Sequence, residues 1–223
     1  SFGIVIVAFV VVQALVLTGS ISSSMKGLLV PICAYIIMAV SLNLTVGILG
    51  ELSLGHAGFM SVGAFSGIVV TTSLADTIPS GVVRLILAII VGAICAAIAG
   101  VIVGVPVLRL KGDYLAIVTL AFGEIIKNII NVLYIGKDAS GLHFSILEQK
   151  FTLDETGSMI INGPMGVSGV EKLSSFVSGF ILILITLFII LNLINSRSGR
   201  AIMAVRDNKI AADSIGISTT HYK

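Results

Sequence analysis

Long apolar runs separated by short polar segments make up most of this sequence. A helix needs about 20 apolar residues to cross the hydrocarbon core of a bilayer. We find no sustained alternation of apolar and polar residues, so we expect no strands, and helical spans satisfy their own backbone in lipid. The pattern predicts an all-α, polytopic integral membrane bundle of about six transmembrane helices. They cover approximately Phe2–Leu17, Leu28–Leu49, Leu52–Leu74, Val82–Leu108, Tyr114–Ile135 and Phe176–Ile194.

The composition supports lipid as the solvent. Hydrophobic residues make up 57% of the 223 residues and charged residues only 11%, whereas soluble domains carry about 25% charged residues. Cys33 and Cys95 lie inside apolar runs without redox or metal-site spacing, and we interpret both as packing residues. No basic region precedes the first apolar run, which argues against a signal peptide. The first residue is Ser, so we expect an initiating stretch to be missing.

Lysine and arginine near the helix ends predict the orientation, because cytoplasmic loops carry the excess of basic residues. The loop 136–174 is mainly acidic and the final segment is mainly basic. We therefore predict a transmembrane domain at 1–195, with 136–174 external, and a cytoplasmic coupling segment at 196–223. Both termini are then cytoplasmic. Lys26 and Arg84 fall on the outer side in this scheme, against the rule.

The fourth predicted helix carries a stripe of small residues. Their spacing of four places them on one face, where a neighbouring helix can approach closely. Gly63 and Gly67 repeat this pattern in the third predicted helix. We interpret both stripes as packing surfaces. The stripe of the fourth helix comprises Gly92, Ala96, Gly100 and Gly104.

A glycine-rich polar segment, Gly47–Phe59, separates the second and third apolar runs and contains Glu51, Ser53 and His56. Glycine weakens a helix, and non-helical backbone at membrane depth survives only where it is buried in protein or lines a wet cavity. The segment is therefore either a broken helix that lines a translocation pathway or a short interfacial turn with a capping serine. For His56 alone, a hydrogen-bonded structural role is favoured over a role as proton carrier.

Four polar residues share one face of the fifth predicted helix, because Lys127, Asn128 and Asn131 follow Glu124 at offsets of three, four and seven. Glu124 lies eleven residues after Asp113, which is roughly 16 Å along a helix that rises about 1.5 Å per residue. A charge near mid-membrane is costly, so Glu124 should face the bundle interior and find a partner. The face is either a self-neutralising pair that fixes packing or part of a substrate path.

The segment after the last predicted transmembrane helix places charged residues between sparse apolar ones. This pattern suits short amphipathic helices that dock on a partner outside the lipid, or an interfacial helix resting on anionic lipid. The chain has no phosphate-binding loop, HExxH motif, cysteine ligand cluster or GxSxG elbow. We therefore expect no enzyme active site, no metal site and no cofactor in this chain.

Segments along the whole chain together resemble the branched-chain amino acid permease family of ABC importers. The match is specific because the segments occur in the family's order and cover nearly the whole sequence. They are similar to the family's glycine-rich signature, central signature, external glycine motif and cytoplasmic loop, the last a variant of the alanine-alanine-glycine motif of ABC permeases. The corresponding residues are Leu42–Gly47 with Leu52–Phe59, then Leu108–Ile126, Asn162–Val167 and Ser196–Gly216.

The resemblance implies roles for particular residues. Ile210 stands where many such permeases have Glu, which puts a salt bridge from that position in doubt. The long loop before the last helix resembles that of the M-type permease, whose family members continue past Lys223, so we expect a chain truncated at its C-terminus. ATPase coupling is expected at Arg200, Ala201, Arg206, Ala211, Ala212 and Gly216. The translocation pathway is expected at Ser53, His56, Glu124 and Asn128.

The resemblance also implies an alternating-access pore in a bacterial or archaeal cytoplasmic membrane, with ATP hydrolysed in separate subunits. Expected partners are a second permease subunit, two cytoplasmic ATPase subunits that bind ATP–Mg, an extracytoplasmic substrate-binding protein and membrane lipid, but no nucleic acid. Branched-chain amino acids suit an apolar pathway, and urea or short amides are the alternative substrates. Two alternatives of other classes remain: an ion-coupled secondary transporter that uses Glu124 or His56, and a passive channel. Neither of them needs a docking motif for ATPase subunits.

Overall fold

The computed structural model describes residues 2–19, 22–75, 77–107, 110, 113–138, 141–147, 158–167, 170, 172–218 and 222. Its contacts divide the chain into two compact parts. We call Ser1–Glu51 with Ser174–Lys223 the terminal part, and Leu52–Leu173 the central part. The segment after residue 195 therefore packs with the terminal part. The division into a membrane domain and a coupling segment at that residue stays a functional prediction.

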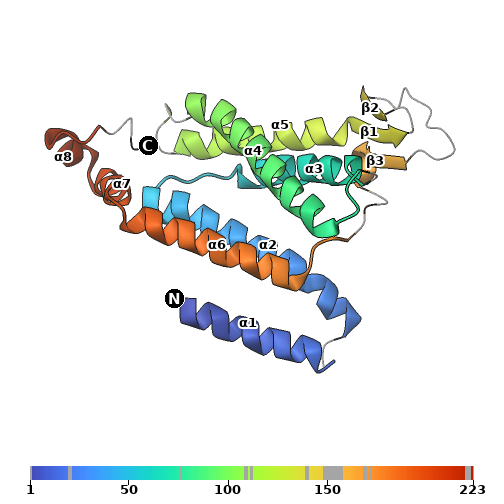
Figure 1. Ribbon diagram of the computed structural model, residues 1–223. Coiled ribbons are helices and arrows are strands. Elements are labelled where there is room, and N and C mark those ends of the chain that lie inside the picture. The colour runs from blue at the N-terminus through green and yellow to red at the C-terminus, as the bar shows by residue number, and fades with distance from the viewer. Residues whose placement is uncertain are drawn as a thin grey trace. The chain divides into compact units, whose positions relative to one another are not determined.

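The terminal part holds two long apolar helices against each other, α2 and α6 (Figure 1). They approach closely where a Cβ atom on Gly179 would lie 2.9 Å from the Cβ of Cys33. Phe9 of α1 stacks on Phe180 of α6, with ring centroids 4.0 Å apart. The elements are α1 (Phe2–Leu17), α2 (Ser23–Asn43), the π-helical turn η1 (Leu44–Leu49), α6 (Phe176–Asn195), α7 (Arg197–Asp207) and α8 (Lys209–Ser214).

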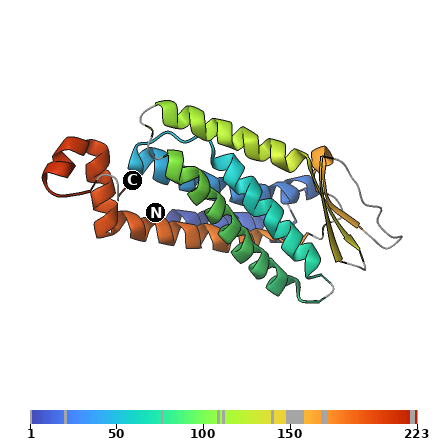
Figure 2. The same cartoon turned by 90° about the horizontal axis from the view of Figure 1, so that it is seen from above.

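The central part packs α3 against both α4 and α5, with a small antiparallel sheet at one end of α3 and α5 (Figures 1 and 2). The strand order is β2-β1-β3. Ile135 of β1 pairs with Phe144 of β2 and with Ile161 of β3. The elements are α3 (His56–Ser73), α4 (Gly81–Val107), α5 (Asp113–Asn131), β1 (Leu133–Asp138), β2 (Gly141–Ile146), β3 (Ser158–Asn162) and the 3-10 turn η2 (Gly163–Met165).

The sheet is fixed to the C-terminal end of α3. Ile135, Ile160 and Ile161 form a buried cluster against apolar side chains of α3. In addition, the Lys137 ammonium donates hydrogen bonds to the carbonyl oxygens of Thr72 (2.9 Å) and Ser73 (3.1 Å). The last carbonyls of a helix have no partner within the helix and carry partial negative charge, so a cation there is favourable.

The packing prediction for the small residues is confirmed for half of the stripe. A Cβ atom on Gly92 would lie 2.6 Å from the carbonyl oxygen of Gly63, so α3 and α4 meet backbone to backbone at this point. A Cβ atom on Gly63 would lie 3.4 Å from the Cβ of Ala96. Gly100 and Gly104 have no described atom within 4 Å of the corresponding positions.

All six predicted apolar runs contain a helix, α1 to α6. In the described part of the chain, Ser23–Leu49, Gly81–Val107, Tyr114–Asn131 and Phe176–Asn195 are long and apolar enough to cross a membrane. The 16 residues of α1 are fewer, and they span about 24 Å of a hydrocarbon core of about 30 Å. The 18 residues of α3 are long enough, but Gly, Ser and Thr make this helix less apolar.

Two expectations are wrong in the region after α5. The fifth helix ends at Asn131 and not at Ile135, and the expected absence of strands is contradicted by β1, β2 and β3. The physical reason is pairing over a distance, because β1 gains ladder hydrogen bonds on both of its edges from β2 and β3.

Candidate functional site

The glycine-rich segment breaks the helical run. After α2 the chain forms the π-helical turn η1, then Gly50 adopts a left-handed conformation with φ of 74°. Residues 50–55 are not helical, and α3 begins only at His56. Gly55 occupies the position before α3 and no side chain caps that end. The break in the helix is therefore confirmed, and no cap by Ser53 is found among the described residues. That the segment lines a translocation pathway stays a prediction.

α3 and α5 approach closely just after this break. A Cβ atom on Gly58 would lie 3.1 Å from the Cα of Gly123. The backbone N–H of Leu54 donates a hydrogen bond of 3.1 Å to the hydroxyl of Thr119. That hydroxyl, in a residue that is only 6% exposed, donates in turn to the carbonyl of Ala116 at 3.0 Å. The non-helical segment is thus fixed on α5 by a buried polar contact.

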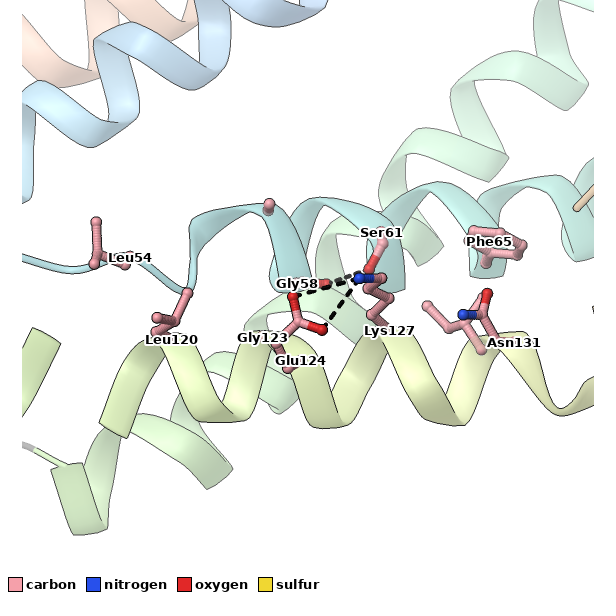
Figure 3. Close-up of a pocket in the computed structure, with 11 residues that line it drawn as sticks. Leu54, Gly58, Ser61, Phe65, Leu120, Gly123, Glu124, Lys127 and Asn131 are labelled. Atoms are coloured by element: carbon pink, nitrogen blue, oxygen red, sulfur yellow. Dashed lines mark hydrogen bonds and ion pairs between the residues drawn. The ribbon is translucent and has the colours of Figure 1, made fainter. Parts of the chain in front are cut away.

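Beside this contact, α3, α5 and the segment before α3 line a pocket of about 360 Å³ (Figure 3). Its walls are mainly apolar. Ala57, Ser61 and Phe65 contribute from α3, at the spacing of four that keeps side chains on one helix face. Polar groups come mostly from α5. The lining residues include Leu54, Ser61, Phe65, Leu120, Glu124 and Lys127.

An ion pair lies in the wall of the pocket. The Lys127 ammonium is 3.1 Å from Oε2 of Glu124 and donates a second, longer hydrogen bond to Oε1 at 3.5 Å (Figure 3). The Lys127 and Glu124 side chains are 64% and 56% exposed in this chain. Charges at membrane depth are expensive in lipid. This face of α5 must therefore meet water or another protein surface in the membrane.

The structure brings together only some of the residues expected on the pathway. Glu124 lines the pocket and pairs with Lys127, so the expected partner is found. Its side chain is 56% exposed in this chain, so the expected burial in the bundle interior is not. Ser53, His56 and Asn128 do not line it, although Leu54 and Ala57, next to the first two, do. Nδ1 of His56 is buried and has no hydrogen-bond partner among the described residues, so the expected hydrogen-bonded role is not found for this atom.

Sequence reasoning missed Ser61 and Phe65. Their spacing from Ala57 was visible in the sequence, but nothing there indicated that this face of α3 meets α5. The contact depends on the close approach of Gly58 to Gly123, which is a tertiary feature.

The segment after α6 folds as two capped helices. The Ser196 hydroxyl accepts a hydrogen bond from the backbone N–H of Gly199 at 3.0 Å. Asn208 caps α8 by accepting from the N–H groups of Ile210 and Ala211 at 3.0 and 3.1 Å. Gly216 follows α8 with φ of 83°, a left-handed conformation that ends helices. Gly216 therefore lies where the chain leaves α8.

This segment packs on the π-helical turn of the same part of the chain. The guanidinium of Arg206 donates a hydrogen bond of 2.8 Å from Nη1 to the carbonyl of Gly47 in η1. Its Nη2 lies 2.8 Å from Oδ1 of Asp207. The Lys209 ammonium is 3.8 Å from Oε1 of Glu51, whose side chain is only 16% exposed. Charged groups of α7 and α8 thus contact the place where α2 stops being an α-helix.

The residues expected to bind ATPase subunits face in different directions. Ala212 is only 2% exposed, so the chain itself covers this side chain. Ala201 is half-buried. The exposed residues are Arg200, Arg206, Ala211 and Gly216.

The exposed apolar side chains of this segment are larger than the alanines. Ile210 is 81% exposed and Ile215 is 75% exposed. A partner surface would therefore contact the isoleucine side chains first, whereas the buried Ala212 side chain would not be accessible to it.

Comparisons with known proteins agree with this architecture. The profile of the family described as "Branched-chain amino acid transport system / permease component" matches residues 24–223. Two relatives are the high-affinity branched-chain amino acid transport system permease proteins LivM of Salmonella typhimurium (strain LT2) and Escherichia coli (strain K12). Each is 32% identical over 203 residues, which cover 85% of this chain and 45% of the relative.

This chain therefore spans less than half the length of these relatives. No solved structure matches it. The family match covers nearly all of the chain, and its apolar helices are those of a multi-pass protein. The chain belongs to the permease-component family of branched-chain amino acid transport systems and is a multi-pass protein of a prokaryotic cytoplasmic membrane.

Proposed function

We propose that this chain is a permease subunit of an ABC importer that moves branched-chain amino acids across the cytoplasmic membrane. ATP–Mg is bound and hydrolysed by two separate cytoplasmic subunits. The observation that carries the proposal is the contact of the coupling segment with the helix break, through the hydrogen bond from Arg206 to Gly47. A force applied to α7 by an ATPase subunit would reach η1 directly.

The exposed face of the coupling segment suits a docking role. Ile210 and Ile215 present apolar side chains to the surroundings, and Arg200 of the same segment is exposed as well. Apolar anchors surrounded by charges are typical of protein interfaces, where rim charges mainly steer association. A helix lying on lipid would bury the same isoleucines, so the partner must be established by experiment.

The pocket between α3 and α5 suits a translocation path for a small substrate. It is mainly apolar, carries charged groups of both signs and lies next to the non-helical segment. The exposed ion pair on α5 requires a wet or protein-covered face. We assign this face of α5 to the wall of the water-filled path and to the contact with the second permease subunit. An extracytoplasmic binding protein delivers the substrate on the side of the loop 136–174.

An ion-coupled transporter is the second candidate, and Glu124 is the residue that suggests it. The Glu124 carboxylate is already paired with the Lys127 ammonium at 3.1 Å, so a coupling ion would have to compete with Lys127 for it. Urea or short amides remain the alternative substrates of the importer. Their uptake would use the same ATP-driven cycle.

Uptake by the reconstituted complex tests the proposal. Proteoliposomes that contain the permease subunits and both ATPases receive labelled leucine with the binding protein on the outer side and ATP on the inner side. We expect uptake that requires ATP and survives collapse of the proton gradient. Leucine uptake driven by a proton gradient without ATP would overturn the ABC assignment, and uptake of urea in place of leucine would overturn the substrate.

A further inference from the structure

We propose that the pocket between α3 and α5 binds the zwitterionic head of an α-amino acid, with Lys127 facing its carboxylate and Glu124 facing its ammonium group. The inference rests on the proposed function, because it names the substrate contacts of the pathway. It goes further by assigning one charge to each side chain and by excluding uncharged substrates.

The charge arrangement of the pocket matches that of a zwitterion. The Lys127 ammonium and the Glu124 carboxylate lie side by side at 3.1 Å, so their charges form a short dipole along α5. The carboxylate and ammonium groups of an α-amino acid are joined through a single carbon and form a dipole of similar length. Placed antiparallel, each ligand charge meets its opposite. Four alternating charges then neutralise one another in a site that lipid cannot solvate.

Both side chains keep capacity for further hydrogen bonds. An ammonium group has three donors and a carboxylate accepts at about four positions. The hydrogen bonds of Lys127 run to the two oxygens of Glu124 alone among the described residues. Both side chains are more than half exposed, so a ligand can approach the pair without displacing a buried contact.

The rest of the pocket suits an aliphatic side chain. Leu54, Phe65 and Leu120 supply apolar wall around the pair. A volume of about 360 Å³ is at the small end of ligand pockets, which run from about 300 to 1,000 Å³. Urea or a short amide would carry no charge for the ion pair and no side chain for this wall. The geometry therefore favours an amino acid with an apolar side chain.

A direct binding measurement tests the inference without the substrate-binding protein, which would impose its own selectivity. The assembled permease–ATPase complex carries Ser61→Cys in a background of Cys33→Ala and Cys95→Ala. A water-soluble thiol reagent labels the pocket, and ligands compete. The probes are leucine, leucinol, which lacks the carboxylate, 4-methylpentanoate, which lacks the ammonium group, and uncharged isovaleramide.

We expect leucine to protect the thiol and the three analogues to need at least about tenfold higher concentrations, because each leaves a charged group of the pair unmatched. Lys127→Gln should abolish the preference for leucine over leucinol. Glu124→Gln should abolish the preference over 4-methylpentanoate. The matched control Lys26→Gln removes a lysine that does not line the pocket, and it should keep both preferences.

Four outcomes would overturn the inference. Equal protection by leucine and the analogues in the Ser61→Cys protein would do so, even if neither charge variant folds. Unchanged preferences in both charge variants would show that the pair only fixes packing. ATP-driven leucine uptake by the complex without any protection by leucine would refute the site and leave the proposed function intact, whereas absence of such uptake would remove both.

Discussion

Arg206→Ala removes the hydrogen bond by which α7 holds η1. The Nη1 atom of Arg206 lies 2.8 Å from the carbonyl oxygen of Gly47, and its aliphatic stem lies against Gly50, where a Cβ atom would be 2.6 Å from Cγ. A hydrogen bond from a charged donor contributes about 1.5–3 kcal/mol. The Arg206 side chain is 38% exposed, so we take about 1–2 kcal/mol, which corresponds to a five- to thirtyfold loss of the docked arrangement.

The assay is the ratio of leucine molecules transported to ATP molecules hydrolysed by the reconstituted complex. Arg206→Ala should keep ATP hydrolysis and lower this ratio about fivefold or more, because the ATPase would move α7 without moving η1. Arg197→Ala is the matched control, since Arg197 is an exposed arginine of the same helix and is not among the expected coupling residues. Equal ratios in the two variants would refute the idea that Arg206 transmits the movement.

Three further predictions concern packing, docking and topology. Gly92→Leu should destabilise the protein by about 1–3 kcal/mol through overpacking against the backbone of α3, which a lower Tm in detergent would show. Gly100→Leu should leave the Tm unchanged, because no described atom lies within 4 Å of a Cβ at Gly100. Ile215→Asp should reduce co-purification of the ATPase subunits at unchanged Tm, because this side chain is 75% exposed; unchanged co-purification would favour a helix lying on lipid. In a protein lacking other cysteines, Leu142→Cys should react with an impermeant thiol reagent from outside, and Ser198→Cys should react only after lysis. Reaction of both residues from one side would contradict the predicted orientation.

The helices were predictable because each depends on local sequence. An apolar run of sufficient length must be helical in lipid whatever its neighbours are. The end of α8 just before Gly216 is equally local, since glycine takes the left-handed conformation without steric cost. The pairing of Glu124 with Lys127 follows from a spacing of three on one helix.

The features that the sequence did not reveal depend on contacts between distant segments. Leu142, Phe144 and Ile146 alternate with polar residues in β2, but this run is short, and the strand depends on its pairing with β1. For Ala212, the spacing indicated a helix face and could not indicate what covers that face. The structure shows that the chain itself covers it, so Ala212→Arg would disrupt α8 before it tested docking.

Filling the pocket between α3 and α5 tests most directly whether it lies on the translocation route. Ser61→Phe places an aromatic ring into a cavity of about 360 Å³. The measurement is ATP-dependent leucine uptake by the reconstituted complex, with co-purification of the ATPase subunits as the check on assembly. We predict that uptake is lost while the complex assembles normally. Uptake at the rate of the unsubstituted complex would show that the substrate takes another path.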